Sequence, residues 1–255
     1  MQHQPSRTAD GSWTLLHGGH GEGFHAREGA WTQAVLRYAR ECRLRERGGE
    51  LAAQGARSLR LLDIGTGLGL NIAAALHELD GLGLVLEVEG FEIDPAVPRA
   101  AVALPPETGS GAAFVARARG ALSNWLDAGR HAGVVEAPGL RLRLHLGDAR
   151  TAVARLPPEP RFDAVFLDPF SPKVEPALWR ADFLGEIARR MAPAARLSTY
   201  AAGSAVRRAL HEAGLQVGRG ARVGAKREGT LASHADGLPP LEPRQARRLH
   251  RPAQG

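Results

Sequence analysis

Cysteine is almost absent from this 255-residue sequence, in which Cys42 is the only one. A single thiol excludes a disulfide framework and a metal site built from several thiolates, and we expect no metal site elsewhere. No apolar run approaches the roughly 20 residues that a membrane helix needs. The first residues also lack the basic and apolar regions of a secretory signal. We therefore expect a cytoplasmic protein without disulfides, metals or a membrane partner.

Lysine is almost as scarce, since Lys173 and Lys226 are the only two, and arginine supplies the rest of the 33 basic residues. These exceed the 27 acidic residues and give a net charge of +6. The planar guanidinium binds phosphate through a fork of donors, so the charge is compatible with a nucleic acid partner, but it can equally serve solubility alone. Residues 37–60 concentrate seven arginines and three glutamates, which form either a solvated helix face or part of an RNA-facing surface.

The length and composition predict one large folded domain with two short flanking parts. Hydrophobic residues make up 44% of the sequence and charged residues 24%, as in ordinary folded domains. Residues 58–233 carry the pattern of the domain. Residues 1–57 begin with a glycine- and histidine-rich stretch and predict a hairpin, a loop and a helix over 30–47. Residues 234–255 combine prolines and arginines with little apolar content, so we expect a disordered basic tail there.

Short apolar runs alternate with helical patterns throughout residues 58–233. We expect strands at 58–64, 84–93, 140–146, 162–167, 196–200, 215–217 and 226–233, and helices at 70–79, 95–104, 149–156, 176–191 and 203–213, with one more within 105–139. Continuous apolar runs are typical of parallel strands that are buried on both faces. The alternation therefore predicts an α/β fold with a doubly wound, mainly parallel, Rossmann-like sheet.

A glycine-rich turn follows the first of these strands. Asp63 precedes Gly65, Gly67 and Gly69, and Asn71 stands in the first turn of the next helix. In such sheets, ligands bind at the carboxyl ends of the strands, and glycines allow the backbone to approach a ligand closely. The spacing differs from that of dinucleotide folds and of phosphate-binding loops. The turn either holds a cofactor, with the acid facing an ammonium group, or is only a tight strand-to-helix connection.

Acidic residues also follow the second and third predicted strands. Glu92 stands at the distance from the glycine turn at which a carboxylate accepts hydrogen bonds from ribose hydroxyls, or it is a solvated acid. Asp94, two residues later, is the expected cap of the next helix. Asp148, which follows Gly147, either accepts a hydrogen bond from an adenine amine or caps the helix behind it.

The fourth strand runs into a loop that begins with Asp168 and contains Phe170 between two prolines. Proline fixes its own backbone φ, so the loop is stiff and presents a carboxylate and an aromatic wall to the ligand side of the sheet. It resembles the acceptor loop of amino-methyltransferases, although a generic proline-rich loop is the alternative. Together the four strand ends describe an S-adenosylmethionine site, in which we expect Asp168 to be the catalytic residue and a cofactor contact.

Several segments resemble the tRNA 5-methylaminomethyl-2-thiouridine methyltransferases, the methyltransferase part of MnmC-like proteins. Residues 166–179, FLDPFSPKVEPALW, are similar to the family pattern F-L-D-x-F-[AS]-P-x-x-N-P-x-[LM]-W. Further similarities lie at residues 10–12, 24–30, 197–200, 206–215 and 226–228. Four residues depart from the family patterns, namely Phe24, Ala26, Pro169 and Glu175.

The resemblance implies methyl transfer from S-adenosylmethionine to an aminomethyl nitrogen on the wobble uridine of a tRNA. It places Asp168 beside the amine and makes Phe170, Lys173, Trp179 and His25 candidate substrate contacts. Trp179 fits an ordinary core position equally well. No FAD-dependent oxidase half follows in this sequence, so we expect a separate oxidase or another enzyme to form the aminomethyl group.

Three other interpretations remain at this stage. The same fold would also serve a methyltransferase that acts on a small-molecule or protein amine. A catalytically silent binding protein would keep the fold, although the intact glycine turn and Asp168 argue against it. A nicotinamide oxidoreductase is disfavoured, because the glycine spacing of dinucleotide folds is missing.

Overall fold

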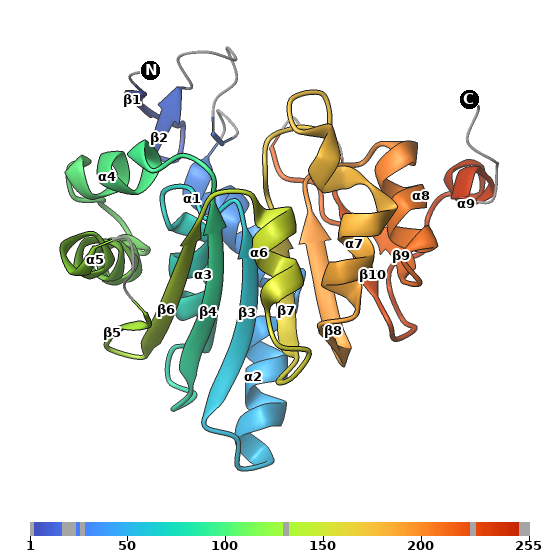
Figure 1. Ribbon diagram of the computed structural model, residues 1–255, viewed down its shortest axis with the longest axis horizontal. Coiled ribbons are helices and arrows are strands. Elements are labelled where there is room, and N and C mark those ends of the chain that lie inside the picture. Colours follow the sequence, from blue (N-terminus) through green and yellow to red (C-terminus); the bar gives the residue numbers. More distant parts are fainter. Residues whose placement is uncertain (1–2, 17–23, 26–28, 130–132, 225–227, 250–255) are drawn as a thin grey trace.

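The computed structural model describes residues 3–16, 24–25, 29–129, 133–224 and 228–249, and its centre is an eight-stranded sheet (Figure 1). The strand order is β5-β6-β4-β3-β7-β8-β10-β9. Five strands are parallel: β3 Ser58–Ile64, β4 Val85–Glu92, β6 Leu140–Leu146, β7 Phe162–Leu167 and β8 Met191–Thr199. The strands β5 Val135–Ala137, β9 Gln216–Arg219 and β10 Thr230–Ser233 pair antiparallel. The predicted mainly parallel α/β fold is confirmed.

Both faces of the parallel strands are buried, as their continuous apolar runs predict. Along β3, Leu59 and Leu61 join one hydrophobic core, whereas Leu62 and Ile64 join the other. The first core is covered by α3 Leu70–Leu79, α5 Ala112–Ala128 and the N-terminal helices. The second is covered by α6 Ala149–Arg155, α7 Ala181–Ala188 and α8 Ser204–Glu212. The described residues contain no helix with the length and apolar content needed to cross a membrane.

The strand order reverses beside β3, and this reversal positions the site. From β3 the chain passes through α3 to β4, then through α4 Ala96–Ala103 and α5 towards β6, and each step moves to the same side of the sheet. After β6 it crosses through α6 to β7, on the other side of β3 (Figure 1). Loops at the carboxyl ends of β3 and β7 therefore diverge to opposite faces and leave a crevice between them, where ligands bind in such sheets.

The N-terminal part forms the expected hairpin, in which β1 Gln4–Arg7 pairs antiparallel with β2 Trp13–Leu16. Its turn is tied to the beginning of α1 Ala30–Gln33 by side chains: Ser12 accepts from the Trp31 N–H at 3.0 Å, and Asp10 accepts from the Thr32 N–H at 2.9 Å. The hairpin therefore caps the first helix as well as preceding it in sequence.

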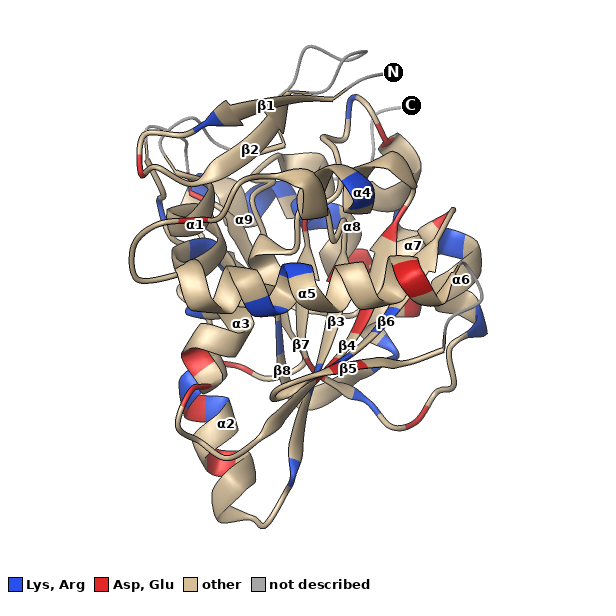
Figure 2. Ribbon diagram, turned by 90° about the vertical axis from the view of Figure 1, so that its left-hand side faces the viewer, with Lys and Arg blue, Asp and Glu red and all other residues tan. Residues whose placement is uncertain are grey.

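The helix predicted over residues 30–47 is not continuous. A π-helical segment, Ala34–Ala39, follows α1, and Arg43 then adopts a left-handed φ of 54° before α2 Leu44–Ala53 begins. Acidic and basic residues mingle along α2 (Figure 2). Arg47 pairs with Asp163 at 2.8 Å, and Arg40 pairs with Glu78 at 2.9 Å. These internal ion pairs favour the solvated-face interpretation of the arginine-rich stretch over an RNA-facing surface.

Three further expectations differ from the structure. The strand predicted over 196–200 is β8, which already begins at Met191, where the predicted helix over 176–191 was expected to end. The helix predicted over 176–191 is a 3-10 turn, Pro176–Trp179, followed by α7, because the backbone of Arg180 is extended at the junction. The predicted disordered tail instead contains α9 Pro243–Leu249. An ion pair of 2.6 Å between Arg219 and Glu242 ties this segment to β9, which composition alone does not reveal. Residues 250–255 lie outside the described residues.

Candidate active site

A cavity of about 810 Å³ opens at the carboxyl ends of β3, β4, β6 and β7, where the strand order reverses. Its volume lies within the range of small-molecule sites. Of the residues predicted to bind the cofactor, six line it: Gly65, Gly67, Glu92, Gly147, Asp148 and Asp168. The remaining three, Asp63, Gly69 and Asn71, are not among its described lining residues. The tertiary structure therefore brings the four predicted strand ends together around one space.

The glycine turn is shaped by backbone conformation and by close approach. Gly65, Gly67 and Gly69 all have positive φ values, of 86°, 56° and 75°. A Cβ atom on Gly65 would lie 2.5 Å from the carbonyl oxygen of Asp168, so a side chain there would push the β3 turn away from the β7 loop. These residues therefore need glycine for a physical reason.

Asp63 is fully buried at the end of β3, and no described residue makes a well-formed hydrogen bond to either carboxylate oxygen. Burial is the main reason why its pKa rises to about 7, and the neighbouring Asp168 raises the pKa further. Thr66 and Asn71 lie close enough to offset part of this rise. A buried carboxylate with open acceptor positions is suited to balancing a nearby cationic group.

Glu92 is 7% exposed and holds the turn after β3 against the turn after β4. Its carboxylate accepts hydrogen bonds from the backbone N–H of Gly67 at 3.0 Å and of Asp94 at 2.9 Å. Burial raises its pKa to about 7, although these hydrogen bonds oppose the rise. Asp94 in turn accepts from the N–H of Ala96 at 2.8 Å, so its side chain satisfies the first N–H of α4, although it lies one residue before the N-cap residue Pro95.

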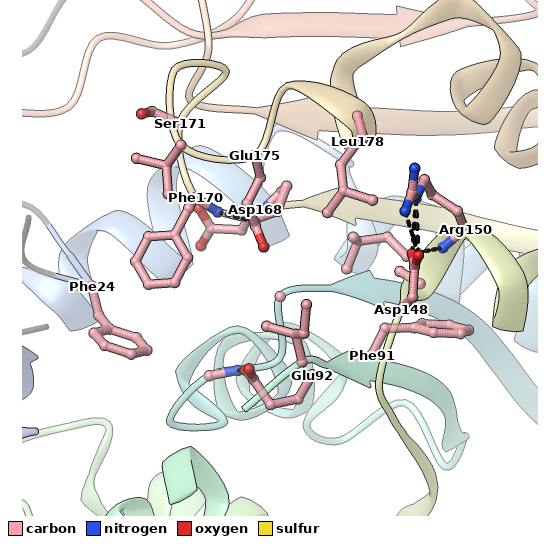
Figure 3. A pocket seen from close by; sticks show the side chains of 18 of the residues that line it. Phe24, Phe91, Glu92, Asp148, Arg150, Asp168, Phe170, Ser171, Glu175 and Leu178 are labelled. Atoms are coloured by element: carbon pink, nitrogen blue, oxygen red, sulfur yellow. Dashed lines mark hydrogen bonds and ion pairs between the residues drawn. The ribbon is translucent and has the colours of Figure 1, made fainter. Parts of the chain in front are cut away.

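Asp148 is the N-cap residue of α6 and lies across the cavity from Phe24 and Phe170 (Figure 3). It accepts from the backbone N–H of Arg150 at 2.9 Å, so the helix-cap interpretation holds. The Arg150 guanidinium also pairs with it at 2.6 Å and lowers the pKa of the Asp148 carboxyl. Both residues line the cavity, so the adenine interpretation remains a prediction for a carboxylate that already has a partner.

Asp168 occupies the centre of the site, where two neighbours hold its carboxylate from different elements. The hydroxyl of Tyr38 donates to Oδ1 in a short hydrogen bond, and the amide of Asn71 donates to Oδ2 at 3.0 Å. Tyr38 is fully buried, and burial together with Asp168 raises its pKa, so the phenol remains a donor. These two hydrogen bonds fix the direction in which the carboxylate faces the cavity.

Sequence reasoning missed Tyr38, which belongs to the π-helical segment of the N-terminal extension. The sequence identified it only as one residue of the helix predicted over 30–47. The wider turn of a π-helix is common at functional sites, but it leaves no signal in the sequence. The pairing of Tyr38 with Asp168 spans 130 residues and exists only because this segment packs beside β7.

The loop after β7 supplies the aromatic wall. Phe170 lines the cavity and contacts Phe24 edge-to-face, with ring centroids 5.4 Å apart (Figure 3). The carboxylate of Glu175 accepts from the Phe170 backbone N–H at 3.0 Å, and the indole of Trp179 donates to the Phe170 carbonyl at 3.0 Å. The backbone of Phe170 is thus held on both sides.

Of the other predicted substrate contacts, only His25 lines the cavity. His25 shares a 3.0 Å hydrogen bond with Thr14 of β2. Trp179 is 5% exposed and belongs to the core, so it supports Phe170 instead of touching the cavity. Lys173 is exposed and outside the cavity lining, because its loop turns it towards solvent. Ala26, Lys226 and Arg227 lie outside the described residues.

Comparisons with known proteins agree with this geometry. Residues 114–235 match a family described as S-adenosyl-L-methionine-dependent methyltransferases. The crystal structure of MnmC2 from Aquifex aeolicus is similar with a TM-score of 0.80 and 30% sequence identity, over 97% of this chain and 75% of that chain. The chain belongs to the MnmC-like methyltransferases. It is therefore an enzyme that depends on S-adenosylmethionine, and its sheet is that of the class I methyltransferases.

Two curated relatives of this MnmC-like chain are bifunctional proteins named tRNA 5-methylaminomethyl-2-thiouridine biosynthesis bifunctional protein MnmC. The protein from Caulobacter sp. (strain K31) is 34% identical over 199 residues, which cover 72% of this chain and 31% of that protein. The protein from Ralstonia nicotianae is 33% identical over 194 residues, which cover 71% of this chain and 27% of that protein. The chain thus spans less than a third of the length of these relatives.

The described residues of the MnmC-like cavity fit S-adenosylmethionine, which combines a sulfonium, an ammonium, a ribose and an adenine. Four carboxylates and one arginine are among its described lining residues, so the cavity favours a cationic ligand. Asp63 adds a buried carboxylate with open acceptor positions behind Gly65. Phe91, stacked on His145 with centroids 4.7 Å apart, adds a flat apolar surface at the end of β4.

Proposed function

We propose that this enzyme methylates an aminomethyl nitrogen on the wobble uridine of a tRNA, in the cytoplasm. The observation that carries the proposal is the carboxylate of Asp168, held by Tyr38 and Asn71 at the wall of an acidic, partly aromatic cavity. The similarity to proteins named for tRNA 5-methylaminomethyl-2-thiouridine biosynthesis supports the choice of acceptor.

Residues of the four strand ends would hold the cofactor. Glu92 would accept hydrogen bonds from the ribose hydroxyls, and Asp63 would balance the ammonium charge from behind the glycine turn. Asp148 and Gly147 would flank the adenine. When bound, S-adenosylmethionine supplies an electrophilic methyl group on its sulfonium. The protein's contribution is to place the acceptor nitrogen in line with that methyl group, and such positioning accounts for several kcal/mol of many barriers.

Asp168 would act on the acceptor nitrogen. An alkylamine is protonated at neutral pH, and it must lose a proton before its lone pair can attack. The Asp168 carboxylate accepts a hydrogen bond from the amine and directs the lone pair into the cavity, with the proton passing to this carboxylate or to water. Tyr38 and Asn71 keep the carboxylate in one orientation. Phe170 and Phe24 would face the base, since stacking on an aromatic side chain contributes roughly 1–3 kcal/mol per base.

The acceptor amine has to be made before this step. The curated bifunctional relatives are more than three times as long as the segment that matches this chain. We infer that an oxidase or another enzyme that forms the aminomethyl group acts first on the same tRNA, either as a separate protein or as a further part of a longer chain.

The test is transfer of a labelled methyl group from S-adenosylmethionine to tRNA that carries the aminomethyl uridine. Nucleoside mass spectrometry should place the label on the wobble uridine. The same tRNA without the aminomethyl group is the matched control and should remain unlabelled. Equal labelling of both tRNAs would reject the amine as acceptor, and labelling of a ribonuclease-treated extract would indicate a small-molecule or protein amine instead.

A further inference from the structure

A second cavity, of about 480 Å³, lies between α8, α9 and the β9–β10 hairpin, and we name it the arginine cavity. Its described lining contains four arginines and one glutamate, namely Arg207, Arg219, Arg222, Arg248 and Glu228. In Figure 1, α8 and α9 lie at the β9 edge of the sheet, away from β5 and β6. The methyl-transfer chemistry uses none of these residues.

Arg207 is the buried residue of the arginine cavity, and hydrogen bonds hold its guanidinium in place. Its side chain is 3% exposed, and it donates hydrogen bonds to Thr230 at 3.1 Å, to the Gly229 carbonyl at 3.1 Å and to Glu228 at 3.0 Å. These bonds use Nε and Nη2, and no described residue accepts from Nη1. A buried guanidinium held in one orientation loses little conformational entropy when its remaining donors bind a ligand.

The other three arginines of this cavity lie nearer to solvent than Arg207. Arg219 pairs with Glu242 at 2.6 Å on the exposed side of the cavity. Arg222 and Arg248 are exposed, and neither forms an ion pair with a carboxylate within the described part of the chain. The cavity therefore combines a fixed inner guanidinium with two outer guanidinium groups that are available to an anion. Charge-assisted hydrogen bonds from arginine suit the oxygens of a phosphate.

The arginine cavity and the active cavity share a segment of chain. Tyr200 lines the active cavity, and its hydroxyl donates to the Pro169 carbonyl at 2.9 Å. Ala202 and Ser204 line the arginine cavity. Four residues of extended chain span at most about 14 Å, so a polymer whose reacting group enters one cavity can reach the other with its next few units.

We propose that the arginine cavity binds a backbone phosphate of the RNA strand whose modified nucleoside enters the active cavity. This inference rests on the proposed function, since it names the part of the tRNA that the second cavity holds. An RNA backbone places phosphates at short, regular intervals from the reacting base. Phosphate contacts fix the register of a nucleic acid without reading its sequence, so this site would align the strand for transfer.

The experiment compares two double variants in binding a tRNA anticodon stem-loop over a range of KCl concentrations. Arg222→Gln with Arg248→Gln removes the two outer arginines. We expect about 10-fold weaker binding at 100 mM KCl, and a slope of log Kd against log salt that is lower by about 1 to 2, as expected for one or two lost phosphate contacts. Binding of S-adenosylhomocysteine, measured by calorimetry, should match that of the unaltered enzyme and show that the variant is folded.

The matched control is Arg141→Gln with Arg161→Gln. These exposed arginines lie at the amino ends of β6 and β7, at the end of the sheet opposite the active cavity. The control removes the same net charge and should change RNA affinity by less than 2-fold. Equal weakening by both double variants would overturn the proposal, because overall charge would then explain the binding.

Methyl transfer and phosphate titration separate the remaining outcomes. If the stem-loop binds through Arg222 and Arg248 but aminomethyl tRNA is not methylated, the proposed function fails and the phosphate site stands. If the tRNA is methylated and RNA affinity is the same in both double variants, or if the unaltered enzyme binds no RNA, the phosphate site fails. Stabilisation by inorganic phosphate that depends on Arg222 and Arg248, without an effect on RNA affinity, would overturn the RNA assignment in favour of a small anion.

Discussion

The two cavities of this enzyme have opposite charge composition. Four carboxylates and one arginine are among the described lining of the active cavity, whereas four arginines and one glutamate are among that of the arginine cavity. They also differ in burial. Asp63 and Glu92 are buried and have raised pKa values, whereas Arg222 and Arg248 are exposed. The active cavity therefore lies beside buried acids with raised pKa values, whereas the arginine cavity adds two exposed arginines to the buried Arg207.

This difference shows how one protein can offer separate sites to cationic groups and to an anionic polymer. A sulfonium donor and an amine acceptor are cationic groups, and buried carboxylates attract them strongly because little water screens the charges. An RNA backbone is anionic and long, and exposed arginines attract it at a distance without a deep pocket. The following predictions test how far the active cavity depends on its acids and on the aromatic wall beside them.

The largest effect is expected for Asp168→Asn. The amide keeps the size of the side chain, but it is uncharged and cannot take up the proton that the amine loses. We expect kcat to fall by at least about 100-fold, which is typical of a lost proton acceptor. The affinity for S-adenosylhomocysteine, measured by calorimetry, should change by less than about 3-fold. If cofactor affinity fell as much as kcat, Asp168 would belong to the cofactor site and not to the acceptor.

A smaller effect is expected for Tyr38→Phe, which removes the hydroxyl that donates to Asp168 and leaves the buried ring in place. We expect kcat to fall about 10-fold, because the carboxylate loses one of the two hydrogen bonds that it accepts from the described residues Tyr38 and Asn71. The acid limb of the pH–rate profile should also shift to higher pH, because the carboxylate loses a donor that favours its charged form.

Tyr200→Phe is the matched control for Tyr38→Phe. It removes a hydroxyl of the same kind from the cavity wall, but this hydroxyl donates to the Pro169 carbonyl and not to Asp168. The pH–rate profile should therefore remain in place. An equal shift in both variants would mean that the Tyr38 hydroxyl has no special role in orienting the carboxylate.

The third prediction concerns pH. Burial raises the pKa of Asp63 to about 7, so the folded protein binds this proton more tightly than the unfolded chain. The contribution of the protonated acid to stability is complete below the unfolded pKa, near 4, and is lost as the pH rises through about 7. We expect the Tm of the ligand-free enzyme to fall between pH 5.5 and 8, and to fall less in Asp63→Asn, where Glu92 still contributes. Thermal denaturation at matched salt would check both.

The same titration should appear in cofactor binding with the opposite sign. An ammonium group favours ionised Asp63, so the affinity for S-adenosylhomocysteine should rise between pH 6 and 8 and be about 5- to 10-fold lower in Asp63→Asn at pH 8. Calorimetry over this range measures it. Parallel pH profiles for the two proteins would contradict a role of Asp63 towards the cofactor.

The smallest effect is expected for Trp179→Phe. The substitution keeps an aromatic ring in the core but removes the indole donor to the Phe170 carbonyl. We expect a loss of about 1–2 kcal/mol in stability, in line with a lost hydrogen bond and a smaller ring, and a rise in KM for tRNA of a few fold. Denaturant unfolding and steady-state kinetics measure these. An unchanged KM would show that Trp179 contributes to stability but not to tRNA binding.

Most strands and helices of the parallel sheet could be predicted closely, because their signals are local; β8 is an exception, since it begins at Met191 and was predicted to begin at residue 196. The run from Ser58 to Ile64 and the helix from Leu70 to Leu79 have the predicted bounds. Predictions were poorer where a distant contact decides the conformation. The helix in the tail contacts α8, and neither this helix nor the break at Arg43 has a sign in the composition.

The site divides in the same way. Chain order was enough to identify the residues that end the strands, namely the glycine turn, Glu92, Asp148 and Asp168, because parallel strands bring their carboxyl ends to one edge. Three other features could be seen only in the folded molecule: Tyr38 from the N-terminal extension holds Asp168, Trp179 supports Phe170 from the core, and four scattered arginines meet in a second cavity. Trp179 and Phe170 are only nine residues apart, but Tyr38 and Asp168 are 130 residues apart, and such contacts form only once the hydrophobic cores have packed.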